Sequence, residues 1–399
     1  MKTTLYCLLF LFVFTASAQK KVLDHPDFDI WNTIKNQSLS NNGKYVMYSL
    51  EKGEKDRFLK IKDVKGNLIL SHDRVAGGQF TYDSKQAFFT IKAWKDSLKE
   101  MKRRKVKKAK IPKDTLAIFN IKNKSLVKIS NVKSYKAPQK WSGYIAYWLH
   151  DIKKVKSKGK SKGKKKKAKK VSSKNGYHLV LRNLKTQKED TIKYVKKYSF
   201  AKEGKRLSYI TTGTDKIGGL YVLNLENNTT SEVFTAKNTV KYYQNTFNDK
   251  GTALGFVVDT DSTKALIRPY QLYVWKKGSE RASMIMNDKN SPKGYLVSSN
   301  GRISFSKDNS KMYFGLATQP IVKDTTLLRD EIVNVEVWAY DSPRLYTVQE
   351  IQAGRDKRKS YSAALHLNSN KVVQLATTKY PNASFGNEGN SENVLISNP

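Results

Sequence analysis

The chain has almost no cysteine. Its 399 residues include only Cys7, which lies in the apolar run from Leu5 to Phe14. Lys2 precedes this run and the small residues 16–18 follow it, which is the order of regions in a secretory signal peptide. Residues 1–18 are therefore predicted to direct export and to be removed. The mature chain then has no cysteine, which excludes a disulfide scaffold, thiol chemistry and cysteine–zinc sites.

Long apolar runs are also missing after the first 18 residues. No later stretch approaches the ~20 apolar residues that a membrane helix needs. We therefore expect a soluble mature chain, periplasmic or extracellular, of about 380 residues, which is long enough to be held together by a large buried core.

Acidic residues are few: 34 Asp and Glu stand against 75 Lys and Arg, giving a formal charge of +41. Two segments carry much of the excess, Lys95 to Lys113 with +8 and Asp151 to Lys174 with +12. The second segment has almost no apolar residues and cannot offset the entropy lost on folding. Both are interpreted as insertions between strands, the second as a solvated loop.

Deleting Val155 to Lys170 is expected to change the melting temperature by no more than about a degree or two, because long surface loops contribute little stability. Thermal unfolding of the deletion variant beside the intact chain measures this. A fall of many degrees would place these lysines in the packed structure.

A turn-and-strand pattern recurs along the chain. Each copy has an apolar residue, a polar or charged turn residue three positions later, a small residue, and an aromatic residue nine positions after the first. An Asp or Asn in such a turn can accept hydrogen bonds from the turn's amides, and a neighbouring Gly or Asn tolerates positive φ. Each copy therefore predicts a tight turn leading into a strand. The five copies are 39–48, 80–89, 200–209, 247–256 and 305–314.

A second strand-like element follows each copy, and together the elements repeat at regular spacing. These elements are 58–61, 116–121, 220–225, 272–275 and 335–338. Segments 141–148 and 177–184 form a degenerate copy, and 360–377 is expected to be another blade. The units begin 41 to 61 residues apart, close to the ~40–50 residues of propeller blades.

The predicted fold class is therefore all-β, a β-propeller of the seven- or eight-bladed type, incomplete in this chain, over residues 19–399. A β-sandwich is the alternative, because turn-punctuated strands describe it too. Helix is expected only for a turn or two between Lys95 and Pro112.

Two stretches resemble a known family. Asp27 to Tyr48 is similar to the opening of the propeller in large secreted bacterial members of the prolyl oligopeptidase family, and Val335 to Gln349 resembles a late blade of it. The resemblance implies a propeller that covers an α/β-hydrolase domain and admits short peptides. In that family the hydrolase domain carries a Ser in a Gly-x-Ser-x-Gly turn, followed along the chain by Asp and His.

The chain has one literal match to that motif, Gly159-Lys-Ser161-Lys-Gly163. A nucleophile elbow needs a buried strand before the serine and a helix after it, whereas Ser161 is surrounded by lysines. No catalytic residue is predicted. A further strand is expected to start at Asn393, so the propeller and the hydrolase domain are expected to continue beyond Pro399.

No cofactor or metal site is predicted either. The histidines are scattered, and no segment has the alternating carboxylates of a calcium loop. His150-Asp151 is the only adjacent His–carboxylate pair and is interpreted as a solvated pair. The tryptophans are expected to pack in blades and not to form a ligand platform. The histidines are His25, His72, His150, His178 and His366, and the tryptophans in question are Trp94, Trp141, Trp148, Trp275 and Trp338.

The predicted function is the substrate-gating propeller of a secreted serine peptidase, with the hydrolase domain of the same polypeptide and peptide substrates as partners. Two alternatives remain: a stand-alone secreted binding propeller, and a polyanion binder that acts through its lysine-rich loops. Export argues against a specific nucleic-acid partner.

Overall fold

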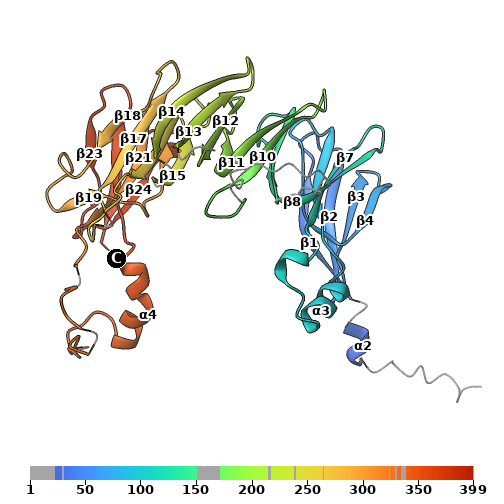
Figure 1. Cartoon of the computed structure of the whole chain (residues 1–399), viewed down its shortest axis with the longest axis horizontal. Coiled ribbons are helices and arrows are strands. Elements are labelled where there is room, and N and C mark those ends of the chain that lie inside the picture. The colour runs from blue at the N-terminus through green and yellow to red at the C-terminus, as the bar shows by residue number, and fades with distance from the viewer. Residues whose placement is uncertain are drawn as a thin grey trace, which may run out of the picture. The chain divides into compact units, whose positions relative to one another are not determined.

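The computed structural model describes residues 23–28, 31–150, 171–213, 217–237, 240–263, 265–322, 324–328, 330–333 and 338–398 (Figure 1). The predicted signal peptide, most of the lysine-rich segment 151–174, and Ser161 lie outside these residues. The chain divides into two compact units: 1–80 with 87–112 and 117–127, and 81–86 with 113–116 and 128–399.

The first unit contains a four-stranded antiparallel sheet in chain order and the start of a second sheet. β1 (Asn32–Leu39), β2 (Tyr45–Lys52), β3 (Phe58–Asp63) and β4 (Leu68–Asp73) pair in sequence, and β5 (Val75–Phe80) pairs with β6 (Gln86–Ile91). β7 (Asp114–Asn120) adds Phe119 to a core that also holds Met47, Ile61 and Phe89. β2 alternates between buried and half-buried residues, whereas consecutive apolar residues of β6 and β7 are buried on both faces.

Short helices lie at the edges of the first unit. α2 (His25–Phe28) precedes β1, and α3 (Lys95–Arg103) and the 3₁₀ turn η2 (Lys108–Lys110) lie between β6 and β7. The helical turns predicted between Lys95 and Pro112 are confirmed. None of the residues of α3 is buried, so the helix lies on the surface.

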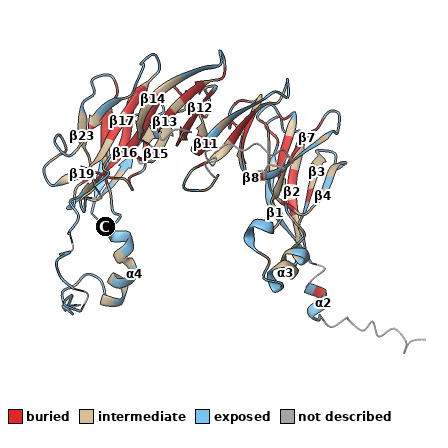
Figure 2. Cartoon of the chain, viewed as in Figure 1, coloured by how far each residue is buried: buried red, intermediate tan, exposed pale blue. Residues whose placement is uncertain are grey.

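The second unit continues the same chain-ordered antiparallel pairing. One run comprises β8 (Leu126–Lys136), β9 (Tyr144–Leu149), β10 (Tyr177–Asn183), β11 (Glu189–Phe200), β12 (Arg206–Thr211), β13 (Ile217–Asn224) and β14 (Thr229–Lys237). A four-stranded sheet follows, β15 (Lys241–Phe247), β16 (Ala253–Asp259), β17 (Tyr270–Lys276) and β18 (Ser283–Met286). Buried residues concentrate along the strands (Figure 2).

The last sheets of this unit are less regular. β19 (Tyr295–Val297) and β20 (Ser304–Phe305) both pair with β21 (Lys311–Thr318), which is followed by β22 (Tyr361–His366) and β23 (Val372–Gln374). β24 (Asn382–Phe385) pairs with β25 (Val394–Ser397) across a loop that contains the 3₁₀ turn η3 (Asn387–Gly389). The strand expected near Asn393 is thus present as β25.

β11 belongs to two four-stranded arrangements at once. Its first half pairs with β10, for example Thr191 with Val180, and its second half pairs with β12, for example Phe200 with Leu207. The change falls at Tyr194, whose φ is 57°, in a region that few non-glycine residues adopt. This local bend lets one strand close one sheet and open the next.

The repeated turns work as predicted in three copies. The side-chain oxygens of Asn42, Asp83 and Asp308 accept hydrogen bonds from the amides two residues later, at 3.1, 3.3 and 2.9 Å. Residues after or within the turns take the expected positive φ, as at Gly43 and Asn309. The Asp or Asn oxygen therefore replaces a backbone acceptor in each turn.

The other two copies differ. Glu203 is paired with Lys140 at 3.0 Å, and at the copy containing Lys250 the turn amides are bound by Asn248. Gly204 has no positive φ, but a side chain there would collide with the backbone oxygen of Lys250. The small residue in this copy is needed for the close approach of two turns.

The expectation of a separate blade at 360–377 is wrong. β22 and β23 complete the sheet begun by β20 and β21, with Phe314 opposite Ala363. β22, and not the second element expected at Val335 to Trp338, lies beside β21 in this sheet. Residues 334–337 lie outside the described residues, and Trp338 is in no strand and is 70% exposed. The segment between β21 and β22 is therefore an insertion.

This insertion contains a helix that the sequence analysis missed. α4 (Tyr346–Asp356) has no buried residue, and the only helix expected was near Lys95. Tyr346 to Gln349 had been assigned to a late blade because Val335 to Gln349 resembles that part of the prolyl oligopeptidase propeller. No strand pairs with this segment in the described structure, so the local i to i−4 hydrogen bonds prevail.

The all-β prediction is confirmed by these sheets. Nowhere in the part of the chain that the structure describes is a helix both long and apolar enough to cross a bilayer.

Candidate functional site

The first strands of successive sheets in the second unit lie side by side and are joined by side chains. Lys136 Nζ on β8 donates a hydrogen bond to the Tyr198 carbonyl oxygen on β11 at 2.9 Å, and Lys197 Nζ on β11 donates to the Tyr242 carbonyl on β15 at 3.4 Å. Gln244 Nε2 on β15 donates to the Ser299 carbonyl at 3.1 Å. Each sheet thus packs its first strand against the first strand of the next.

These first strands share a short sequence that the repeat analysis did not detect. In each, a buried Val is followed directly by Lys, and a Tyr lies two positions after that Lys. The three copies are Val132-Lys133-Ser-Tyr135, Val195-Lys196-Lys-Tyr198 and Val240-Lys241-Tyr-Tyr243. The Val side chains anchor the strands in the core. The Lys side chains then point away from it at equivalent positions, as alternation along a strand requires.

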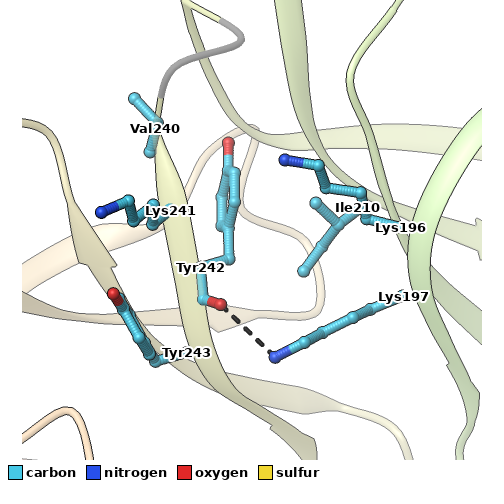
Figure 3. Close-up of a pocket in the computed structure, with 7 residues that line it drawn as sticks. All are labelled: Lys196, Lys197, Ile210, Val240, Lys241, Tyr242 and Tyr243. Atoms are coloured by element: carbon cyan, nitrogen blue, oxygen red, sulfur yellow. Dashed lines mark hydrogen bonds between the residues drawn. The ribbon is translucent and has the colours of Figure 1, made fainter. Parts of the chain in front are cut away.

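A cavity of about 260 Å³ lies between β11 and β15 (Figure 3). Its apolar part is formed by Ile210 and Val240, which are 2% and 7% exposed, together with the Tyr242 ring. Its polar part comprises Lys196, Lys197, Lys241 and Tyr243. Among the described residues that line the cavity there is no carboxylate, and the charged ones are all lysines.

The lysines of the cavity have different surroundings. Lys197 binds the Tyr242 carbonyl, whereas the side chain of Lys196 runs toward the hydroxyl end of the Tyr242 ring (Figure 3). Burial lowers the pKa of Lys196, and the nearby Lys174 ammonium lowers it further. Within the described residues, no hydrogen bond or ion pair neutralises Lys196. The cavity therefore holds a half-buried ammonium that no described carboxylate pairs with.

The equivalent lysine one sheet earlier is arranged differently. Lys133 Nζ lies 3.6 Å from the centroid of the Tyr177 ring and 5.4 Å from that of Trp148. Ring faces are weakly negative and attract cations. This first-strand lysine therefore has an aromatic partner, while Lys196 and Lys241 line an open cavity.

Adjacent four-stranded antiparallel sheets with neighbouring first strands define the architecture. The fold is a β-propeller. The sheets can accordingly be called blades, with β11 to β14 and β15 to β18 forming the two blades on either side of the cavity.

No protein-family model and no curated protein matches the sequence. Among solved structures, a prolyl endopeptidase is similar at 10% identity with a TM-score of 0.43, covering 91% of this chain and 45% of that one. The propeller domain of the Trilobed protease from Pyrococcus furiosus matches at 10% identity and a TM-score of 0.37, covering 88% and 86%.

An acylaminoacyl peptidase from Pyrococcus horikoshii is similar at 10% identity and a TM-score of 0.37, covering 89% of this chain and 48% of that one. This chain thus spans about half the length of the two peptidases that were compared as whole chains. Since unrelated activities share propeller folds, these matches concern the fold alone.

A second cavity of the propeller, about 270 Å³, lies beside the repeated turns and is lined by residues of both charges. Asp249 pairs with Lys202 at 2.9 Å and with Lys307 at 2.8 Å, and the Glu203 amide donates to the Asp249 carbonyl. These bonds join the turns of successive blades. They explain the charged residues of the turns as structural contacts.

A third cavity of about 200 Å³ has Arg268 in its lining. The Arg268 guanidinium is already engaged: it donates to Asp259 at 2.6 and 2.9 Å and to Asp261 at 2.6 Å. Both carboxylates lie at the end of β16 or just after it. The arrangement closes a loop, so the charge of Arg268 is already matched; among the described residues, Lys357 is the other charged residue of the lining.

The histidines are not brought together by the propeller. His72 lies beside Asp73 with 3.3 Å between Nδ1 and Oδ1, and the His150 ring packs against Tyr177. His25 and His366 lie on α2 and β22. Among the described residues, none of these four rings is hydrogen-bonded to a serine, and no group of three or more His, Cys, Asp or Glu could hold a metal. His178 lies on β10 against Tyr194, and Asp151 is outside the described residues.

The tryptophans divide into two groups. Trp141 and Trp275 are buried and Trp148 packs edge-on against Tyr198, so these three pack within blades as predicted. The prediction is wrong for Trp94 and Trp338, which are 49% and 70% exposed. The Arg74 guanidinium lies 4.4 Å from the centroid of the Trp94 ring and covers part of it. The contact partner of this tryptophan is thus a cation and not the core of a blade.

Proposed function

We propose that this chain is the propeller part of a secreted serine peptidase similar to prolyl oligopeptidases, and that it controls peptide access to a hydrolase domain outside these residues. The observation that carries the proposal is the row of first strands joined from blade to blade by Lys136, Lys197 and Gln244. In propellers such strands surround a central channel. Side chains on them are therefore in position to select what passes.

The proposal assigns the chemistry to the hydrolase domain. Acyl transfer needs a nucleophile within hydrogen-bond reach of a base that is itself oriented by a third group. His72 has a carboxylate neighbour but no serine bonded to its ring among the described residues. The 399-residue chain alone is accordingly proposed to bind and to gate without hydrolysing.

The proposal predicts no hydrolytic activity in the purified mature chain. A fluorophosphonate probe should label no serine stoichiometrically, and short proline-containing peptides should not be cleaved above a buffer control. The coding DNA after the Pro399 codon should encode further propeller strands and a Gly-x-Ser-x-Gly motif followed by Asp and His. Stoichiometric labelling would contradict the division of labour between the domains.

The same DNA reading separates the second candidate function. The open, positively charged cavity favours a stand-alone binding propeller, because ligand binding there requires no hydrolase domain. Unrelated sequence after Pro399, together with a monodisperse and cooperatively folding 399-residue product, would support that function and overturn the peptidase proposal.

A further inference from the structure

The cavity between β11 and β15 has an apolar part and a positively charged part, and together these define a ligand class. It has an apolar part, formed by Ile210, Val240 and the Tyr242 ring, and a rim of lysines. Tyr242 adds an aromatic surface only, because its hydroxyl is buried. A ligand that fills this space must have an apolar stem and an anionic head.

Within the part of the chain that the structure describes, no acid that is free to pair neutralises the lysines of the cavity. The carboxylate that acts on the lining residue Tyr243 is Asp259, and Arg268 binds that carboxylate at 2.6 Å. Lys174 brings a further positive charge near Lys196. An anion that entered would meet the lysine ammonium groups of the lining, at a place where partial burial strengthens the attraction.

The size of the cavity limits what part of a ligand it can enclose. Sites that enclose a whole small molecule measure roughly 300–1,000 Å³, whereas this cavity measures about 260 Å³. It therefore fits one residue of a longer ligand. A glutamate side chain and the last residue of a peptide with its carboxylate both match the apolar part and the lysine rim.

We propose that this cavity is a subsite for a carboxylate-bearing peptide residue, with Lys196 and Lys241 as the residues that bind the carboxylate. The subsite makes the propeller favour peptides with an acidic or C-terminal residue at this point. It rests on the proposed function, since it supposes that peptides reach the first strands. Lys197, whose ammonium already binds the Tyr242 carbonyl, contributes charge but is less free to move to the ligand.

The test is isothermal titration calorimetry of the mature chain with four probes. Three are tetrapeptides with a capped N-terminus: Ala-Pro-Ala-Glu amide, Ala-Pro-Ala-Gln amide, and Ala-Pro-Ala-Gln with a free C-terminal carboxylate. The fourth is inorganic phosphate alone. At least one of the two anionic peptides should bind more tightly than the neutral amide by about tenfold or more, as expected for one charge-assisted hydrogen bond. A tighter Glu amide identifies the side chain as the ligand, and a tighter free acid identifies the chain end.

Two substitutions locate the binding to the cavity. Lys196→Gln and Lys241→Gln should each weaken binding of the anionic peptide about tenfold and leave the neutral amide unaffected. The matched control is Lys193→Gln, which alters an exposed lysine of the same strand that does not line the cavity. It should change binding less than twofold by rough allowance for screened surface charge. Should Lys196→Gln fail to fold, the exposed Lys241 carries the test.

Three results would overturn the subsite: equal affinity for neutral and anionic peptides, unchanged affinity in both cavity variants, or phosphate binding more tightly than either carboxylate peptide. None of these depends on the hydrolase domain. Loss of the subsite with a hydrolase motif after Pro399 would leave the proposed function standing. Carboxylate binding together with unrelated sequence after Pro399 would support the binding site and contradict the proposed peptidase function.

Discussion

Replacing Phe256 by alanine should lower the free energy of unfolding by about 3–5 kcal/mol, the usual range for removing a large aromatic side chain from a core. Phe256 lies on β16 with no exposed surface, stacked on Tyr273 at a centroid distance of 5.5 Å and edge-on to Phe234 at 5.9 Å. Phe234 belongs to the preceding blade, so the cavity left by the substitution would open between two blades. Chemical denaturation of the variant measures the loss.

Met284→Ala is the matched control for this prediction. Met284 lies on β18 of the same blade and is 49% exposed, so its truncation should change stability by no more than about 0.5 kcal/mol. Equal effects of the two substitutions would show that the packing between these blades does not hold the fold together.

Replacing Asp259 by asparagine should destabilise the chain by about 2–3 kcal/mol. Asp259 is 1% exposed and accepts two hydrogen bonds from Arg268, so its loss leaves a partly buried guanidinium with one carboxylate partner. Breaking a fully buried pair costs about 3–5 kcal/mol. The expected loss is smaller here because Asp261 still binds Arg268 and because 21% of the Arg268 side chain remains exposed.

Glu232→Gln provides the comparison. Glu232 pairs with Arg281 at 2.9 Å, but both side chains are largely exposed. Such a surface pair contributes at most about 1 kcal/mol. Urea unfolding of both variants beside the intact chain should therefore separate them clearly, and a loss for Glu232→Gln as large as that for Asp259→Asn would refute the burial argument.

The local part of the fold was predictable from the sequence, because the repeated turns use short-range chemistry. Asn42, Asp83 and Asp308 bind amides two residues away, so the residues themselves specify the turn. The strands that follow were predicted for the same reason. Their ninth-position aromatics, such as Phe89 and Phe256, are fully buried.

The long-range part was not predictable in the same way. β22 pairs with β21 across an insertion that contains α4, and nothing in Tyr361 to His366 identifies which earlier strand it joins. Val335 to Trp338 had the local composition of a strand and was assigned that place in the blade. Strand pairing depends on partners distant in the chain, and local propensity does not determine which strand the partner is.

The candidate site was missed because its lysines were counted only as bulk charge. The Val-Lys-x-Tyr sequences lie outside the turn pattern. Val132 and Val195 lie within β8 and β11, and Val240 directly precedes β15. Aligning the repeats on their first strands, and not only on their turns, would have revealed Lys196 and Lys241 as equivalent residues. Only the structure could show that they share a cavity.

The strand β11 has a consequence for how this molecule comes apart. In repeat architectures, units that touch only through side chains can open one at a time. β11 instead supplies backbone hydrogen bonds to β10 on one side and to β12 on the other, through a single continuous segment. Its two halves pair with different neighbours, so the strands on either side of β11 are linked through the backbone and are expected to unfold together. β14 and β15 belong to different sheets and share no strand, so local opening is expected between them.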